Sequence, residues 1–358
     1  MERRTGRPRI ADVAREAGVS KTAVSFAFNN PSRLAAGTAS RIREVAETLG
    51  YRPNPVARLL TQPRTMTLGV LTPQALAATF SNPFFAEFSA GVAETAERLG
   101  YALHFISPLR GSLALAVDRA TVDGVVAIGL SASHPEVEQI QAAGVPMVLV
   151  DSDDLPGYSS VVADDEAGAR AAAEHLLSLG HRELLVLAVE EPMGMAGRGR
   201  PAASGVTARR LRGYRAAFAA ASTELPPGCV VATTASIDGG ARAFRRSWLA
   251  GLRPTAVLAM SDAMAIGAMS AARDLGIAVP SELSVVGFDD IDIAGHVEPA
   301  LTTVHQPIRE KGAEAARLVL AGIEDRDPTP QRRRLPTRLV VRGSTAPAPQ
   351  PTDPLQPD

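Results

Sequence analysis

The segment IADVAREAGVSKTAVSFAFNN, residues 10–30, decides the fold of the N-terminal part of this chain. Gly18 suits the left-handed position that ends a short helix, and Ser20 can cap the next helix with its hydroxyl. The segment therefore predicts a helix-turn-helix, a motif whose second helix enters the major groove of duplex DNA. The first helix is predicted by four apolar residues at the spacing of one helical face: Ile10, Val13, Ala14 and Ala17.

A third helix completes this predicted head and ends at Gly50. The small core of the head is expected to contain Val24, Ala27 and Phe28 from the second helix and Ile42, Val45, Ala46 and Leu49 from the third. The opposite side of the second helix is expected to face DNA and carries Lys21, Thr22, Ser25 and Phe26.

Charge is distributed unevenly along the 358 residues. Residues 1–65 contain 12 Lys and Arg against 5 Asp and Glu, whereas the remainder contains 25 against 33, and the net charge is −1. A basic head on a near-neutral chain is the electrostatic pattern of a phosphate binder. The alternative is a solvated basic tail, but a tail does not explain the patterned helices. That alternative rests on four clustered arginines: Arg3, Arg4, Arg7 and Arg9.

The segment YRPNPVARLL, residues 51–60, predicts a second element that contacts DNA. Asn54 can cap a helix with Pro55 at its first position, and only about two turns follow before Pro63. So short a helix is marginal in water and would order on DNA or on a partner copy. Leu60 could then wedge between base steps in the minor groove and kink the duplex. From these residues alone, an interdomain linker whose leucines pack on a neighbour is an equally good interpretation.

Motifs in a fixed order continue along nearly the whole chain. In the head they are Asp12-Val13-Ala14, Ala17-Gly18-Val19-Ser20, Val24-Ser25, Asn29-Asn30, Leu49-Gly50-Tyr51, Pro53-Asn54 and Ala57-Arg58. Later ones include Asn82-Pro83-Phe84-Phe85-Ala86-Glu87, Leu179-Gly180-His181-Arg182, Arg210-Leu211-Arg212-Gly213-Tyr214, Pro254-Thr255-Ala256, Val279-Pro280, Ser284-Val285-Val286-Gly287-Phe288-Asp289-Asp290 and Leu301-Thr302-Thr303-Val304. With these motifs the chain, to about residue 342, resembles the lactose-repressor (LacI) family of bacterial transcription regulators.

The resemblance implies a set of DNA contacts in the head and hinge. They are Lys21, Thr22, Ala23, Ser25, Phe26, Asn29, Thr38, Asn54, Ala57 and Leu60. Phe26 stands where many relatives carry an arginine, and a phenyl ring can contact a thymine methyl or pack but cannot donate to guanine. Ala35 replaces a common serine that caps the third helix. The operator sequence therefore does not transfer from the family.

Beyond residue 66, short apolar runs alternate with amphipathic helices, which predicts parallel sheets covered on both faces. The predicted strands are 68–71, 102–106, 122–128, 146–150, 184–188, 230–233, 256–260 and 283–287. The resemblance implies two such lobes with a cleft between them. We therefore expect an all-α helix-turn-helix head over residues 1–52 and a hinge helix and linker over 53–66. A doubly wound, two-lobe α/β core like a periplasmic binding protein should cover 67–343, and a Pro-rich disordered tail 344–358.

Ligands of a doubly wound fold bind at the carboxyl ends of its strands. By the resemblance, effector-contacting positions are occupied by Phe84, Phe85, Arg210, Ser261 and Asp289, with Asp151 as a further candidate at a strand end. Carboxylate and arginine suit bidentate hydrogen bonding to hydroxyls or to a polar heterocycle. The alternative is that the phenylalanines pack in the core and the acids cap helices. We prefer helix capping for Asp262, and we expect Trp248 to pack rather than stack on a ligand.

The chain lacks the sequence patterns of an enzyme. Its six histidines show no metal-ligand spacing, and there is no nucleophile elbow or phosphate-binding loop. The carboxylate pairs at 153–154, 164–165 and 289–290 give no acid/base geometry by themselves. We therefore expect no catalysis, no metal and no cofactor. Cys229 lies in an apolar run and predicts a buried thiol in a reducing compartment.

No apolar run is long enough to span a bilayer, and the N-terminus is too polar for a signal peptide, so we expect a cytoplasmic protein. This argues against a solute-binding protein without a DNA role, and a regulator that needs no effector stays an alternative. The expected protein is a homodimeric repressor of a palindromic operator. Its effector is expected to be sugar-like rather than a nucleobase, although Ser261 replaces a common cleft asparagine, and to act by changing the angle between the lobes.

Overall fold

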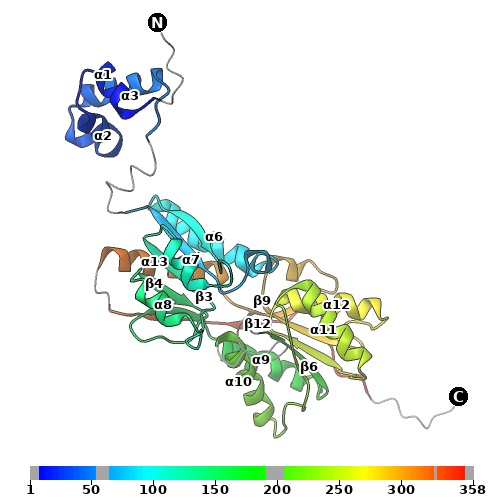
Figure 1. The fold of residues 1–358 in the computed structure, drawn as a ribbon. Helices are drawn as coiled ribbons and strands as arrows, with labels where there is room; N and C mark the ends of the chain where they lie inside the picture. The colour runs from blue at the N-terminus through cyan, green and yellow to red at the C-terminus, as the bar shows by residue number, and fades with distance from the viewer. Residues whose placement is uncertain (1–7, 54–63, 191–204, 326–328, 351–358) are drawn as a thin grey trace, which may run out of the picture. The chain divides into compact units, whose positions relative to one another are not determined.

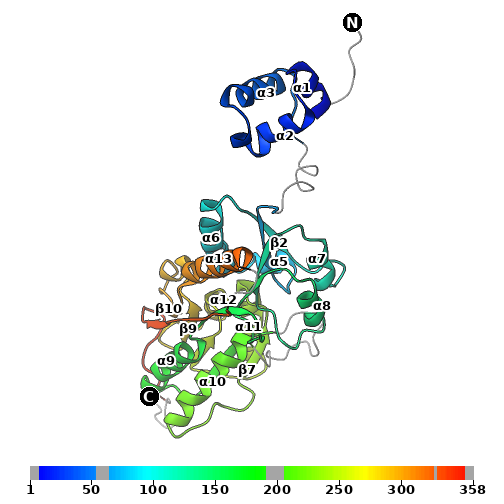
Figure 2. The same ribbon diagram turned by 90° about the vertical axis from the view of Figure 1, so that its left-hand side faces the viewer.

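The computed structural model describes residues 8–53, 64–190, 205–325 and 329–350. The chain divides into two compact units (Figures 1 and 2). Met1–Thr65 form the head, and Met66–Asp358 form the core.

The head is a bundle of three short helices around a small apolar centre. Helices α1 (Ile10–Glu16) and α2 (Lys21–Asn29) are joined through Gly18, which has a φ of 63°. The Ser20 hydroxyl accepts a hydrogen bond from the Ala23 amide at 3.1 Å, so the predicted cap is present. After the 3-10 turn η1 (Pro31–Arg33), helix α3 (Ala36–Thr48) closes the bundle. The fully buried centre consists of Val13, Val24, Ala27 and Ile42.

Within the described residues, the core contains two six-stranded sheets with the same strand order. The first has the order β11-β5-β4-β3-β1-β2 and is formed by β1 (Thr67–Leu71), β2 (Ala102–Ile106), β3 (Gly124–Ile128), β4 (Met147–Val150), β5 (Ser159–Ala163) and β11 (Arg332–Leu335). The second has the order β12-β10-β9-β8-β6-β7 and is formed by β6 (Leu184–Val189), β7 (Val230–Thr233), β8 (Ala256–Ala259), β9 (Ser284–Asp289), β10 (Thr302–His305) and β12 (Arg338–Val340). Strand β12 pairs antiparallel with β10, and the other described pairings are parallel.

Helices cover both faces of each sheet, as the alternation of strands and helices requires (Figures 1 and 2). The first lobe carries α5 (Leu76–Thr79), α6 (Phe84–Arg98), α7 (Leu113–Arg119), α8 (Val137–Ala142) and α13 (Ile308–Glu324). The second carries α9 (Asp165–Ser178), α10 (Gly205–Ala220), α11 (Ile237–Leu249), α12 (Asp262–Asp274) and the 3-10 turn η2 (Asp292–Gly295). Neither lobe is therefore a continuous piece of chain.

The described chain passes between the lobes at three places: after β5, after β10 and after β11. Beside the first two crossings the helices pack very closely, because a glycine faces the neighbouring backbone. A Cβ on Gly91 of α6 would lie 1.9 Å from the Arg309 carbonyl oxygen of α13, and one on Gly213 of α10 would lie 2.3 Å from that of Glu166 of α9. Equivalent helices of the two lobes thus use the same packing device.

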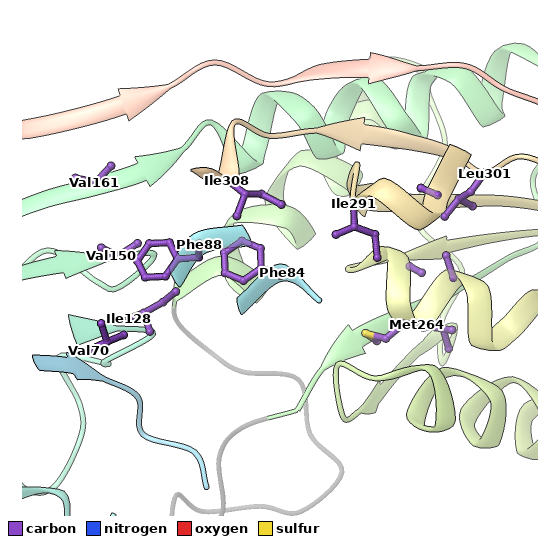
Figure 3. Close-up of a cluster of buried hydrophobic side chains, with 14 of the residues drawn as sticks. Val70, Phe84, Phe88, Ile128, Val150, Val161, Met264, Ile291, Leu301 and Ile308 are labelled. Atoms are coloured by element: carbon purple, nitrogen blue, oxygen red, sulfur yellow. The ribbon is translucent and has the colours of Figure 1, made fainter. Parts of the chain in front are cut away.

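One cluster of buried apolar side chains contains residues of both lobes (Figure 3). Phe84, Phe88 and Ile308 lie in the first lobe, whereas Met264 and Leu301 belong to the second. The hydrophobic interior is therefore continuous from one lobe to the other.

The eight predicted strands are all present, with small shifts at their ends, and four further strands were not predicted: β5, β10, β11 and β12. Strand β11 contains three consecutive arginines, an unusual strand sequence. It lies at a sheet edge, where its exposed arginines pair with Asp154, Glu314 and Asp164. Charge at a sheet edge discourages pairing with another chain.

The prediction of disorder from residue 344 onward was wrong for residues 344–350. Ser344 is fully buried, its carbonyl accepts from the Val285 amide at 2.8 Å, and its hydroxyl donates to the Val285 carbonyl at 2.6 Å. The Ala348 amide donates to the Leu179 carbonyl at 2.8 Å. The prolines in this segment leave enough backbone amides to bind the second lobe. Residues 351–358 lie outside the described residues.

Candidate nucleic-acid interface and ligand cleft

Helix α2 presents one face to the core of the head and another to solvent. Lys21 and Thr22 are exposed, and the other predicted contact residues of this helix are half-buried: Ala23, Ser25, Phe26 and Asn29. Thr38 is half-buried in the first turn of α3. The side-chain amide of Asn29 donates to the Ser25 hydroxyl at 3.3 Å, one turn away. The structure thus gathers polar donors and acceptors on and beside one surface helix, as reading of base edges requires.

Phe26 has a cationic neighbour that the sequence interpretation missed. The guanidinium of Arg33, from η1, lies 5.4 Å from the centre of the Phe26 ring, and Arg33 is exposed. The ring cannot donate a hydrogen bond, but the adjacent guanidinium carries five N–H donors. A spacing of seven residues across a turn gives no periodic signal, so only the folded structure brings these residues together.

Helix α2 is held by the third helix as well as by its own cap. Arg43 of α3 donates two hydrogen bonds, at 3.2 and 3.0 Å, to the Ala27 carbonyl near the end of α2. Ala35 precedes α3 without a side-chain cap. The other predicted DNA contacts, Asn54, Ala57 and Leu60, lie outside the described residues and stay predictions.

A cavity of about 280 Å³ lies between the two lobes of the core. All six residues predicted to contact an effector line it: Phe84, Phe85, Asp151, Arg210, Ser261 and Asp289. Apolar groups, among them Ile128, Leu130 and Met260, line the cavity together with hydroxyl and amide side chains such as Ser236 and Gln306. A concave, largely apolar cavity with a few fixed polar groups is the usual form of a small-molecule site.

The two phenylalanines come from the start of α6. Phe84 is 8% exposed, stacks on Phe88 with 6.2 Å between ring centres, and meets Phe85 edge to face at 5.4 Å. Phe84 therefore packs in the hydrophobic interior and also lines the cavity, and its contact with an effector stays a prediction. Trp248 packs against Phe244 outside the cavity lining, as expected.

Arg210, on α10, is a cation that lines the cavity. It is 4% exposed, and its Nε donates to Asp165 at 2.9 Å while Nη1 donates to the Met260 carbonyl. Its guanidinium carbon lies 3.5 Å from the centre of the Phe288 ring, and Nη2 lies 3.9 Å from Asp289. The side chain is therefore fixed before any ligand arrives.

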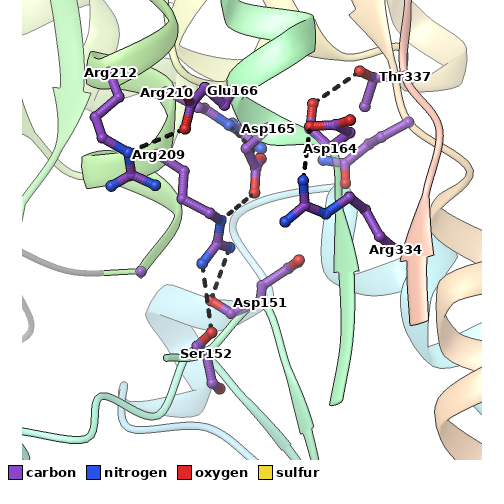
Figure 4. Close-up of polar contacts among 12 residues, drawn as sticks. Asp151, Ser152, Asp164, Asp165, Glu166, Arg209, Arg210, Arg212, Arg334 and Thr337 are labelled. Atoms are coloured by element: carbon purple, nitrogen blue, oxygen red, sulfur yellow. Dashed lines mark hydrogen bonds and ion pairs between the residues drawn. The ribbon is translucent and has the colours of Figure 1, made fainter. Parts of the chain in front are cut away.

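Asp165 accepts from two arginines of the same helix. Arg209 Nε lies 2.9 Å from the second oxygen of Asp165, and its Nη groups reach the Ser152 and Asp151 carbonyls at 3.4 and 3.5 Å (Figure 4). Burial is the largest single influence on the pKa of Asp165 and raises it, but the positive charges of Arg210, Arg209 and Lys311, together with the hydrogen bond from Arg210, lower the pKa on balance. The carboxylate therefore stays ionised, and Arg209 also ties the second lobe to the backbone of the first.

Asp151 and Asp289 occupy equivalent places in the two lobes. Asp151 follows β4 and Asp289 ends β9, and these strands have the same position in their sheets. Both residues have positive φ, 52° and 126°, a conformation that side-chain-bearing residues rarely adopt. Strained backbone of this kind concentrates at functional sites.

Ser261, and not Asp262, caps the start of helix α12. The Ser261 hydroxyl accepts from the Met264 amide at 3.3 Å. Asp262 does not cap the helix, so that prediction was wrong. Its carboxylate accepts from the Ile291 amide at 2.9 Å and from the Thr303 hydroxyl, and so joins α12 to the loop after β9 and to strand β10.

Three buried polar residues of this region were missed in the sequence: Asp165, Gln306 and Lys311. Asp165 and Lys311 both lie on buried faces of their helices, Asp165 in phase with Gly168, Ala169 and Ala172. A charged residue at an apolar helical phase is the signal that could have found them. Gln306 lies in the second interlobe crossing, for which the sequence gives no signal.

Burial raises the pKa of Asp289 to about 8, an effect that nearby Arg210 only partly opposes. Between its ordinary value of 3.8 and about 8, the folded protein keeps a proton that the unfolded chain has lost. We therefore expect the free energy of unfolding to fall as pH rises through this window, and Asp289→Asn to reduce that dependence. Urea denaturation at several pH values between about 6.5 and 8 measures the difference, because burial raises the pKa of Asp262 only to about 6.

The exposed carboxylate Asp274, paired with Arg245 on the surface, offers a matched control. Asp274→Asn should leave the pH dependence unchanged. Parallel curves for the wild-type chain and Asp289→Asn would contradict the assignment of the titration to Asp289.

The arrangement defines a class of protein: a basic helix-turn-helix head joined to a two-lobe core with a small-molecule cavity. A family model described as "Bacterial regulatory proteins, lacI family" matches residues 9–54, and one described as "Periplasmic binding protein-like domain" matches residues 173–345. The HTH-type transcriptional regulator DegA of Bacillus subtilis is 33% identical over 347 residues, covering 94% of this chain and 98% of that protein.

Two solved structures extend the comparison. The transcriptional regulator CelR in complex with cellobiose is 30% identical, with a TM-score of 0.69 over 94% of this chain and all of that one. A lac repressor dimer bound to operator and the anti-inducer ONPF is 27% identical, with a TM-score of 0.77 over 95% of this chain and all of that one. The chain belongs to the LacI family of bacterial regulatory proteins. It is thus a DNA-binding transcription regulator and not an enzyme, which confirms both predictions.

None of the helices in the described ranges combines the length and apolar character needed to cross a bilayer.

Proposed function

We propose that the protein is a cytoplasmic, homodimeric repressor of a roughly palindromic operator, controlled by an uncharged, sugar-like effector in the interlobe cleft. Two copies bring two heads to the two half-sites, as the symmetry of such operators demands. Support for the DNA role comes from the exposed face of α2, the basic charge of residues 1–65 and the operator-bound lac repressor dimer.

The internal pairing of the buried charges carries the proposal for the effector. Arg210 is engaged by Asp165 and lies beside Asp289, and Asp151 is engaged by Lys311. An anionic ligand would have to compete with the ionised Asp165 for Arg210, whereas hydroxyl groups can donate to the remaining lone pairs of Asp151 and Asp289 without adding charge. The relative CelR, which was solved with cellobiose, supports a saccharide.

Control follows from the position of the cavity between two lobes joined at three crossings. A ligand that contacts both lobes stabilises one lobe angle, and DNA that prefers another angle opposes it. Such coupling is typically worth about 1–3 kcal/mol and is reciprocal. Leu60, in the segment between head and core, is proposed to wedge into the operator and make the DNA sensitive to that angle.

Selection of duplexes from a random-sequence pool tests the DNA role. The selected duplex should bind with an affinity that falls steeply with salt, with a slope of about −0.9 per neutralised phosphate. Enrichment of no palindromic sequence, or weak binding that does not depend on salt, would argue against operator binding and favour a solute-binding protein.

A thermal-shift screen of neutral mono- and disaccharides, their phosphates, and nucleobases tests the effector. Stabilisation by a neutral saccharide that also changes affinity for the selected duplex supports the proposal. Stabilisation by a sugar phosphate or a nucleobase alone would contradict the effector class, and stabilisation by none would favour a regulator without an effector.

A further inference from the structure

The core buries a lysine directly behind the ligand cavity. Lys311 lies on α13 in the first lobe, and its side chain is 0% exposed. Lysine is almost never fully buried unless its charge is paired. We propose that Lys311 is a positioning residue for effector recognition, which orients the cavity-lining carboxylate Asp151 and links it across the lobes to Asp289. This inference rests on the proposed function.

The contacts of the ammonium group are short and directed at cavity residues. Lys311 Nζ donates to both carboxylate oxygens of Asp151 at 2.8 Å and to the side-chain oxygen of Gln306 at 2.5 Å. It also lies 5.4 Å from the centre of the Phe84 ring. Asp151, Gln306 and Phe84 all line the cavity, whereas Lys311 does not. The lysine therefore acts on a ligand only through the groups that it holds.

Gln306 extends these contacts into the second lobe. Its side-chain nitrogen donates to Asp289 Oδ1 at 2.6 Å, and Arg210 Nη2 lies 3.9 Å from the same oxygen. A continuous polar chain thus runs from Asp151 in the first lobe, through Lys311 and Gln306 at the second crossing, to Asp289 in the second lobe. Each end of this chain faces the cavity.

Stability alone does not account for a lysine at this position. A buried ion pair is often no more stabilising than well-packed apolar residues of similar size, because both charges lose their hydration. The neighbouring buried residues of α13 are apolar or small: Ile308, Gly312, Ala315 and Ala316. What an apolar side chain cannot do is fix the two oxygens of Asp151, whose backbone already has a positive φ, in one orientation.

Lys311→Met in the full-length chain removes the ammonium group and keeps the length of the side chain. We expect the affinity for the saccharide that stabilises the wild-type protein to fall about 10- to 100-fold, the scale of losing a charge-assisted hydrogen bond. Arg309→Met is the matched control, because Arg309 lies on the same helix and pairs with Glu87 and Glu94 at the surface. It should leave the affinity unchanged.

A double-mutant cycle with Asp151→Asn separates positioning from structural support. If Lys311 acts through Asp151, Lys311→Met should cost much less affinity in the Asp151→Asn background than in the wild-type background. An equal loss in both backgrounds would overturn the proposal. The double variant also removes the unpaired buried carboxylate, so it keeps the test usable if Lys311→Met alone folds poorly.

The distance between the lobes provides a readout that needs no ligand. Spin labels at Glu138→Cys and Glu224→Cys, in a Cys229→Ala background, report from exposed positions on the two lobes. Lys311→Met should broaden the distance distribution, and Arg309→Met should not. If no saccharide binds the wild-type protein, the proposed function fails, and an unchanged distribution in Lys311→Met would overturn the present proposal separately.

Discussion

Arg210→Met is expected to abolish stabilisation by any effector and to lower the free energy of unfolding by about 3–5 kcal/mol, the usual cost of removing one partner of a buried ion pair. Asp165, which is fully buried, would keep Arg209 but lose Arg210, which lies at the same distance of 2.9 Å and is the more deeply buried of the two arginines. The cavity would lose the cation beside Asp289 and the group that stacks on Phe288. Urea denaturation and the saccharide thermal-shift assay measure the two effects.

Arg212→Met is the matched control for this variant. Arg212 lies on the same helix and pairs with Glu166, but both side chains are about half exposed. Exposed ion pairs contribute between 0 and about 1 kcal/mol, so stability and effector response should be close to wild type. Retention of full saccharide affinity by Arg210→Met would show that the effector site does not use this side chain.

Thr22→Glu is expected to lower DNA affinity at least about 100-fold, because a carboxylate on the exposed face of α2 would lie opposite phosphates and base-edge acceptors and repel them. Thr22 is exposed at the second position of α2. A negative charge near a helix N-terminus stabilises that helix by about 0.3–1 kcal/mol, so unfolding would not explain the loss. Fluorescence anisotropy with the selected duplex gives the affinity, and circular dichroism gives the stability.

Thr48→Glu controls for net charge. It adds the same charge to the same basic head at the exposed end of α3. Affinity should fall only slightly, by the loss of long-range attraction that salt screens. If Thr22→Glu and Thr48→Glu weaken binding equally, α2 does not form the specific interface.

The sequence predicted the head well because its signals are local. Gly18 and Ser20 act on neighbouring residues, and the apolar phases need no knowledge of distant contacts. Strands β5 and β10 were missed for the opposite reason. Both strands are short and begin with two hydroxyl side chains. They form because of their neighbours in the sheet, β4 beside β5 and β9 beside β10.

The cavity could be predicted only in part. Residues placed just after strong apolar strands, such as Asp151 and Asp289, are found by knowing where parallel sheets bind ligands. Lys311 and Gln306 lie more than 150 residues from Asp151, so no spacing rule relates them. Their roles depend on the second interlobe crossing, which a one-dimensional pattern does not show.

The three crossings also determine the order in which the head and the two lobes can fold during synthesis on the ribosome. The head is finished once α3 has emerged, but the first lobe waits for α13 and β11, which end at Glu324 and Leu335. Until then α6 lacks its partner helix, and the edge of β5 has no neighbour. We therefore expect the head of a nascent chain to fold well before the ligand cavity forms. During that interval, we expect chaperones to bind the apolar surfaces that are still exposed.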